Sequence, residues 1–100
     1  MIIVYITCKN NAEARKISKH LLEKKLIACS NMHKIKSMYW WNGRIVDDSE
    51  VVIIAKSTEK NYSAIKKEVK NLHSYKIPCI LKINADANDE YYKWVEGEAS

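Results

Sequence analysis

The chain has 100 residues, 47% of them hydrophobic and 29% charged, and a formal net charge of +5. This length supports one domain with a modest core, so we expect residues 1–100 to form a single unit. No apolar run approaches the roughly 18 residues of a membrane span, and no secretory signal follows Met1, so the sequence favours a soluble cytoplasmic protein without a membrane partner. Lysines interleave with glutamates, which argues against a nucleic-acid partner.

The N-terminal quarter predicts a strand and then an amphipathic helix. Residues 2–8 are apolar on both alternating faces, which is typical of a central strand buried from both sides. Asn10 precedes Glu13 by three residues, a capping-box pattern that predicts the start of a helix of about four turns. The expected apolar face of this helix consists of Ala14, Ile17 and Leu21, with Leu22 beside it.

Two long strand-like runs flank Asn42-Gly43 and predict an antiparallel ribbon. Asn-Gly is a strong hairpin signal because both central residues of a type I′ turn need positive φ. The first run, about 28–41, is far longer than the roughly 5–6 residues of an average strand, so we expect its tip to protrude. Ile35 lies between two lysines, and we expect a bulge or a break there.

Aromatic residues occupy both faces of this ribbon near its turn. Met38 and Trp40 alternate with Tyr39 and Trp41, and successive side chains of a strand point to opposite faces. The two tryptophans therefore cannot share one core. An uncovered aromatic patch indicates association with another subunit.

The C-terminal half predicts a second helix, a short strand and a terminal helix. Thr58 is expected to cap the second helix, which ends before Pro78. Its apolar stripe consists of Tyr62, Ile65, Val69 and Leu72. Residues 79–83 read as a strand. The side chains expected to face inward from the terminal helix are Tyr91, Trp94 and Val95.

The predicted element order is βαββαβ plus a short C-terminal helix. With right-handed crossovers, this order gives an α+β ferredoxin-like sandwich, in which an antiparallel four-stranded sheet carries both main helices on one face. The other face of the sheet then has no cover.

The sequence resembles the CutA family, the divalent-cation tolerance proteins, along nearly its whole length. The resemblance is carried by the Leu-Ile-Ala-Cys-Ser-Asn run at 26–31, by Tyr39-Trp40-Trp41 with Gly43 two positions later, and by the spacing of His73, Tyr75 and Pro78. It implies a ferredoxin-like fold, similar to that of the GlnB-like nitrogen-regulatory signalling proteins, assembled into a tight homotrimer by strand pairing between subunits. It also implies a link to tolerance of copper and other divalent metals.

Two positions depart from the family pattern, which usually reads His-Pro-Tyr and then Pro-Glu. Ser74 stands in place of the proline and Cys79 in place of the glutamate. If that glutamate carries a site, a soft sulfur ligand here replaces a hard oxygen ligand. This change favours Cu(I) or Zn over Mg or Ca.

The candidate metal ligands are His73, Cys79 and Cys29. Imidazole and thiolate both suit copper and zinc, whereas three cysteines without a Cys-x-x-Cys pair argue against a four-cysteine zinc site or a disulfide framework. The alternatives are that His73 caps the second helix and that Cys79 and Cys29 are small core residues.

A cleft between subunits is the second candidate site. Its expected lining, aromatic with one lysine, consists of Tyr39, Trp40, Trp41, Lys56, His73 and Tyr75. Such a groove suits a small anion, or the aromatics are themselves the subunit interface. Asp47, Asp48 and Glu50 are expected to form a solvated strand end.

The sequence contains no enzyme motif that we recognise. It lacks a Gly-rich phosphate loop, a Gly-x-Ser-x-Gly elbow and a His-Glu-x-x-His pair. We therefore expect a non-enzymatic protein without an organic cofactor. The resemblance to the CutA family adds the expectation of a homotrimer in metal tolerance that binds copper or another divalent metal. The alternative is a trimeric scaffold or signalling module that binds a protein partner or a small anion in its clefts, with incidental metal binding.

Overall fold

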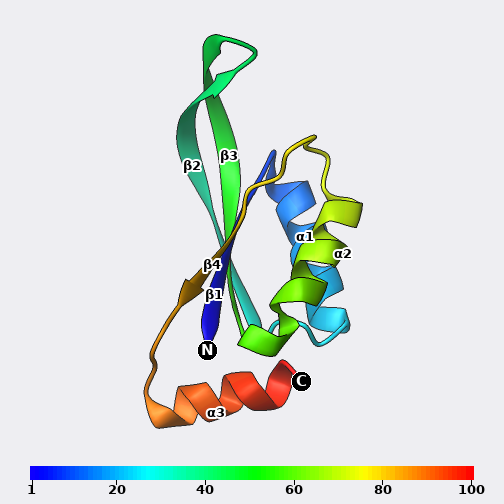
Figure 1. Ribbon diagram of the computed structural model, residues 1–100, viewed down its shortest axis with the longest axis vertical. Coiled ribbons are helices and arrows are strands. Elements are labelled where there is room, and N and C mark those ends of the chain that lie inside the picture. Colours follow the sequence, from blue (N-terminus) through cyan, green and yellow to red (C-terminus); the bar gives the residue numbers. More distant parts are fainter.

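Four strands form one antiparallel sheet in the order β2-β3-β1-β4, with two helices packed on one face and a third at one end (Figure 1). This computed structural model describes residues 1–100. The strands are β1 (Ile2–Cys8), β2 (Cys29–Trp41), β3 (Arg44–Ser57) and β4 (Ile80–Asn84). The helices are α1 (Asn11–Glu23), the 3₁₀ turn η1 (Glu59–Asn61), α2 (Tyr62–Leu72) and α3 (Asp89–Glu98). The predicted ferredoxin-like order is confirmed.

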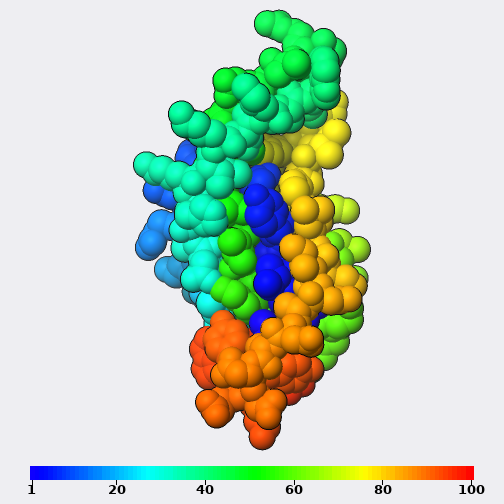
Figure 2. Space-filling view, turned by 90° about the vertical axis from the view of Figure 1, so that its left-hand side faces the viewer, coloured from blue at the N-terminus to red at the C-terminus, as the bar shows by residue number.

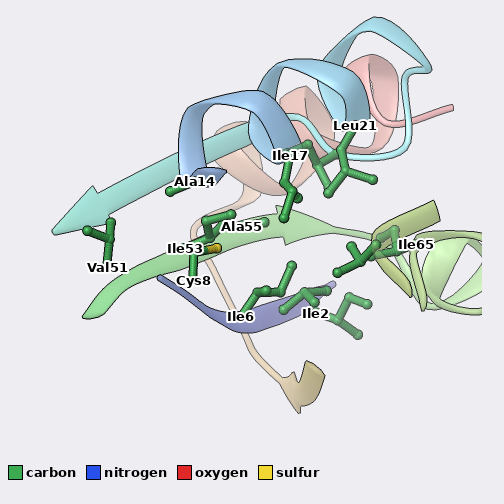
Figure 3. Close-up of a cluster of buried hydrophobic side chains, with 13 residues drawn as sticks. Ile2, Ile6, Cys8, Ala14, Ile17, Leu21, Val51, Ile53, Ala55 and Ile65 are labelled. Carbon is green, nitrogen blue, oxygen red and sulfur yellow. The ribbon is translucent and has the colours of Figure 1, made fainter. Parts of the chain in front are cut away.

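The core lies between the sheet and helices α1 and α2, and it contains 13 buried residues. Alternate residues of β1 enter it, from Ile2 to Cys8, together with Ile53 and Ala55 of β3 (Figure 3). The helices contribute the residues that their periodicity predicted, among them Ile17 and Leu21. Burying each such aliphatic side chain stabilises the fold by roughly 1.5–3 kcal/mol.

The opposite face of the sheet has no helical layer over most of its area (Figure 2). Ile3, Tyr5 and Thr7 of β1 are only partly buried there, so the expectation of a strand buried from both sides is wrong for a single chain. Leu81 and Ile83 of the neighbouring strand are about half exposed, at 51% and 49%. This face is therefore an apolar surface without a partner in the monomer.

The long hairpin is paired without interruption. Its register runs from Cys29 opposite Lys56 to Trp41 opposite Arg44 with no extra residue, so the predicted bulge near Ile35 is wrong. The two lysines beside Ile35 simply point to the other face, and the alternation never slips. The hairpin extends well beyond the helices and gives the molecule its longest dimension, 45 Å (Figure 1).

The hairpin turn has the backbone that its sequence predicted. Asn42 has φ of 50° and Gly43 has φ of 73°. Both values lie in the left-handed region that a type I′ turn requires, and Asn and Gly adopt this region at low cost.

The helix starts differ from the predicted caps. Asn10 accepts a hydrogen bond from the Glu13 amide at 2.9 Å, which is half of the predicted capping box. The Glu13 carboxylate does not return to Asn10 but accepts from the amides of Lys9 and Ser74, each at 2.9 Å. Thr58 makes no side-chain cap, because the 3₁₀ turn separates it from α2 and leaves its buried hydroxyl without a partner.

Helix α3 packs across one end of the sheet through a small number of residues. Val95 is fully buried and Tyr91 partly so. Trp94 is 46% exposed, so the prediction that it faces inward is wrong for the single chain. No helix in the structure combines the length and apolar character needed to cross a membrane.

Candidate functional site

The end of β1 and the segment that follows α2 meet at one place and hold a buried histidine. His73 ends α2, and its side chain is fully buried. Its Nε2 lies 2.7 Å from the Thr7 carbonyl oxygen, and its Nδ1 accepts from the Tyr75 amide at 3.1 Å. Because a carbonyl oxygen only accepts, these partners assign the proton of a neutral ring to Nε2.

Two further donors of metal-ligand type lie beside this histidine. The Cys8 sulfur, a Glu13 carboxylate oxygen and a His73 ring nitrogen all lie within 4.8 Å of one another. Cys8 is buried in the core and Glu13 is 8% exposed. We call Cys8, Glu13 and His73 the buried triad; β1, α1 and the end of α2 each contribute one member.

The protein environment sets opposite charge states for two members of the buried triad. Burial, reinforced by the charges of Glu13 and Glu50, raises the pKa of the Cys8 thiol to about 12. Burial also opposes ionisation of Glu13, but hydrogen bonds from Ser74 and Lys9 and the nearby His73 outweigh it and lower the pKa of Glu13. The metal-free triad therefore pairs a protonated Cys8 thiol with an ionised Glu13 carboxylate.

The buried triad suits a borderline or soft metal by its donor types. One sulfur, one oxygen and one imidazole nitrogen are ligands for copper or zinc rather than for magnesium or calcium. Ligation requires two changes: Cys8 must lose its proton, and His73 Nδ1 must give up the Tyr75 amide. The donor types fit a metal. The hydrogen bonds of Glu13 and His73 are also consistent with a purely structural role for the buried triad.

A cleft of about 600 Å³ lies next to the buried triad, between the hairpin and the segment that follows His73. In Figure 2 the hairpin, teal to green, overhangs the yellow segment. The cleft is lined by Thr7, Ser37, Met38, Tyr39, Trp40, Trp41, Glu50, Tyr75, Lys76, Ile77 and Cys79. Most of these side chains are apolar, so the cleft accepts an apolar or aromatic group.

One buried hydrogen bond crosses the floor of this cleft. The Tyr75 hydroxyl donates to Glu50 at 2.7 Å, and Glu50 is only 7% exposed. Burial and the acceptor Glu50 raise the pKa of Tyr75, which keeps the phenol protonated. The expectation that Glu50 is part of a solvated strand end is therefore wrong.

The predicted metal ligands do not meet within one chain. His73 belongs to the buried triad, whereas Cys79 lines the cleft and Cys29 starts β2. Cys29 lies 3.8 Å from the Lys56 ammonium, on the partner strand. Ligation by Cys79 or Cys29 stays a prediction.

The predicted cleft residues divide into two groups. Tyr39, Trp40, Trp41 and Tyr75 do line one cleft. Lys56 and His73 do not line it. His73 belongs to the buried triad, and Lys56 pairs with Cys29 at the start of β2, so Lys56 could join the others only across a subunit boundary. The lysine that lines the cleft within this chain is Lys76.

Sequence reasoning missed three residues of this region: Cys8, Glu13 and Glu50. The alternation of β1 places Cys8 on the same face as Ile6, so the sequence could have predicted that Cys8 points toward the helix layer. The capping position of Glu13 placed it in the first turn of that helix. Only the chain path after α2, which the sequence does not specify, brings His73 to them.

Comparison with known proteins agrees with these features. The family model "CutA1 divalent ion tolerance protein" matches residues 2–98. The chain is 42% identical to the divalent-cation tolerance protein CutA of Pyrococcus horikoshii over 96 residues, which cover 95% of this chain and 94% of the relative. It is 40% identical to its counterpart from Archaeoglobus fulgidus over 94 residues, 93% of this chain and 92% of that one.

Solved structures show the same fold. The crystal structure of CutA1 from Pyrococcus horikoshii superimposes with a TM-score of 0.96 at 40% identity, covering 100% of this chain and 99% of that chain. The apo form of a protein described as "PII-like protein CutA", from Nostoc, gives a TM-score of 0.93 at 26% identity, covering 100% and 98%. From the family match and these relatives together, the chain belongs to the CutA family of divalent-cation tolerance proteins.

Proposed function

We propose that this protein acts in cellular tolerance of divalent metal ions by binding copper, or another metal of similar softness, at Cys8, Glu13 and His73. The observation that carries the proposal is the meeting of a thiol, a carboxylate and an imidazole within 4.8 Å in the interior. Family membership supports the metal-tolerance role, and the sulfur-containing donor set supports copper or zinc over harder cations.

The residues of the buried triad would hold the metal at the cost of a proton and a hydrogen bond. Cys8 ligates as a thiolate, so binding releases its proton and becomes tighter as pH rises. His73 ligates through Nδ1 and releases the Tyr75 amide, while Nε2 keeps its bond to the Thr7 carbonyl as an outer-shell support. Metal binding is thereby coupled to Tyr75, which lies in the cleft.

The working form in this proposal is a homotrimer. Its support is the amount of unpartnered apolar surface: Trp40 is 71% exposed, Ile45 65% and Ile77 71%, and the uncovered sheet face adds Leu81 and Ile83. A surface of this extent is typical of association rather than of a monomer. The protruding hairpin supplies strands that can pair with a second subunit.

The remaining parts of the proposal concern class and location. We place the protein among non-enzymatic, cytoplasmic proteins without an organic cofactor, since its motifs match no catalytic class and its three cysteines are free.

The test is a Cu(I) titration of the reduced protein against a competing chelator. We expect one ion per chain. Mutating an outer-shell partner of a metal ligand typically lowers metal affinity roughly 10–100-fold, so removing a ligand itself, by Cys8→Ser or Glu13→Gln, should lower the affinity at least as much. Cys29→Ser is the matched control, because this thiol lies outside the buried triad. Cys79→Ser tests the ligand that the sequence suggested.

Three results would decide against the buried triad. Binding unchanged by Cys8→Ser would exclude its sulfur. Loss with Cys79→Ser or Cys29→Ser alone would move the site to those cysteines. Absence of saturable binding in the wild type would contradict the proposed metal site altogether and would favour a function other than metal binding.

The second candidate function is a signalling or scaffold role through the cleft. The apolar cleft of about 600 Å³ favours it, since it is large enough to accept a side chain cluster of a partner or a small ligand. A relative is described as a PII-like protein. Cleft substitutions in the hairpin, such as Met38→Asp, would then abolish partner binding while leaving the copper titration unchanged.

A further inference from the structure

A second cavity lies on the other side of the sheet, between the hairpin and the start of α1. Its volume is about 620 Å³. It is lined by Lys9, Asn10, Asn11, Lys34, Ile35, Lys36, Ser49, Glu50 and Val51. Only Ile35 and Val51 are hydrophobic residues, so most residues around this cavity carry a polar or charged group, whereas most residues around the cleft are hydrophobic.

Three lysines gather around this cavity from two separate elements. Lys34 pairs with Val51 and Lys36 pairs with Ser49 across the ladder. Paired residues share a face, and Val51 belongs to the core beneath α1, so both lysines point to the helix side of the sheet. Lys9 reaches the same space from the end of β1. We call these residues the lysine cavity: Lys9, Lys34 and Lys36.

The positive charge of the lysine cavity has no counter-charge inside it. The ion pairs of the structure involve His20, Lys24, His73 and Lys82 with their acids, and none of the three cavity lysines. The one carboxylate in the lining, Glu50, pairs with Ile35 on the opposite face, where it accepts the Tyr75 hydroxyl. Like charges held together without a partner raise the energy of the free protein and attract anions.

Two acids lie on the helix side of the sheet without lining the cavity: Glu13, which accepts from the Lys9 backbone amide at 2.9 Å, and Asp47. Asp47 pairs with Met38, one step further toward the turn than Lys36, and it does not line the cavity. Two further residues with side-chain hydrogen-bond donors, Ser49 and Asn11, also line the cavity. These groups donate hydrogen bonds to oxygen atoms of an anion.

The lysine cavity lies on the opposite face of the sheet from part of the apolar surface proposed for association. Its lysines project on the helix side, whereas Leu81 and Ile83 lie on the uncovered face. A ligand in the lysine cavity would therefore not compete with subunit contacts through that face.

From these observations we infer that the lysine cavity binds a small polyanion with two or more phosphate groups. Three lysines that line one concave space can together present ammonium groups to several anionic oxygens. A ligand with only one carboxylate would pair with fewer of them. The cavity offers no aromatic surface on which a nucleic-acid base would stack, so recognition rests on the charged group. This site is separate from the buried triad and does not depend on metal binding.

The test is isothermal titration of the metal-free protein with inorganic tripolyphosphate at low ionic strength. We expect one saturable site per chain, with the dissociation constant raised about tenfold by Lys34→Gln and by Lys36→Gln, since each removes a charge-assisted hydrogen bond. The matched controls are Lys60→Gln in η1 and Lys93→Gln in α3. Both are exposed lysines that do not line the cavity, and each substitution changes the net charge equally.

The variants also separate a site from general electrostatics. Lys34→Arg and Lys36→Arg keep the charge and should retain binding, and thermal unfolding of all variants should match the wild type because these side chains are exposed. Equal weakening by the control pair, absence of saturable binding, or tighter binding of single-stranded DNA than of tripolyphosphate would each overturn the inference.

Discussion

At the residue scale, two buried polar side chains differ in whether they have hydrogen-bond partners. The Glu13 carboxylate is buried yet accepts two backbone amides, so its charge is stabilised. The Thr58 hydroxyl is buried and has no hydrogen-bond partner. A buried polar group without a partner costs about 1–3 kcal/mol of stability, because it has lost its hydrogen bond to water.

Thr58→Val should therefore stabilise the protein. The substitution keeps the shape of the side chain and removes the unpaired hydroxyl, and the extended backbone at this position, φ −118° and ψ 157°, suits valine. We expect the free energy of unfolding to rise by about 1 kcal/mol in urea denaturation. Thr58→Ser is the control: it keeps the hydroxyl and loses the methyl group, so an equal gain there would contradict the explanation.

At the element scale, local sequence signals were sufficient where the cause is local. The Asn42-Gly43 turn and the apolar stripe of α2 were both predictable, because each follows from backbone geometry or from one periodicity. The Thr58 cap and the bulge at Ile35 were wrong. In both cases a neighbouring element decides, namely the 3₁₀ turn before α2 and the continuous pairing with β3.

The two glycines of the chain should respond oppositely to alanine. A Cβ at either position meets no atom within 4 Å, so packing plays no part. Gly43 has φ of +73° and should lose about 1 kcal/mol of stability as alanine, whereas Gly97 in α3 should gain about 0.4–1 kcal/mol. Denaturant unfolding of both variants measures this; loss of stability in both would show that backbone conformation is not the cause.

Helices α1 and α2 are joined at the surface by a small charge network. Glu68 accepts from His20 at 2.7 Å and lies 3.1 Å from the Lys24 ammonium. Hydrogen bonds from His20 and then Lys24 lower the pKa of Glu68 from its ordinary value of 4.5. In the unfolded chain this carboxyl binds its proton at a higher pH than in the folded protein.

The network should therefore stabilise the protein above pH 4.5 and lose its effect as the pH falls through the lower, folded pKa. We expect Glu68→Gln to lower the melting temperature slightly at neutral pH and to match the wild type in acid. Glu23→Gln, an exposed change of the same charge outside the ion pairs, is the control. A constant difference between Glu68→Gln and wild type at all pH values would argue against the charge network.

At the scale of the whole molecule, the single chain leaves its aromatic hairpin and one sheet face uncovered. The exposed aromatic surface of the hairpin was predictable from Trp40 and Trp41. Adjacent residues of a strand point to opposite faces, so the two tryptophans cannot both enter the same core. The buried triad was less accessible to prediction. Cys8 and Glu13 are separated from His73 by about two-thirds of the chain, and only tertiary packing brings them together.

Trp41→Ala should weaken the assembly. Trp41 is 42% exposed in the single chain, so it has a large apolar surface available for a second subunit. If that surface is buried between subunits, its removal should cost roughly 3–5 kcal/mol, as for other buried aromatic residues. Sedimentation over a dilution series measures this. An assembly as resistant to dilution as the wild type would contradict the interface role of Trp41.

The most direct test of the metal proposal is copper X-ray absorption spectroscopy of the protein loaded with one Cu(I) per chain. The proposed site predicts a sulfur ligand together with nitrogen or oxygen ligands, and loss of the sulfur signal in Cys8→Ser but not in Cys29→Ser. A sulfur signal that persists in Cys8→Ser, or a wild-type spectrum with nitrogen and oxygen ligands only, would contradict a copper site at Cys8, Glu13 and His73.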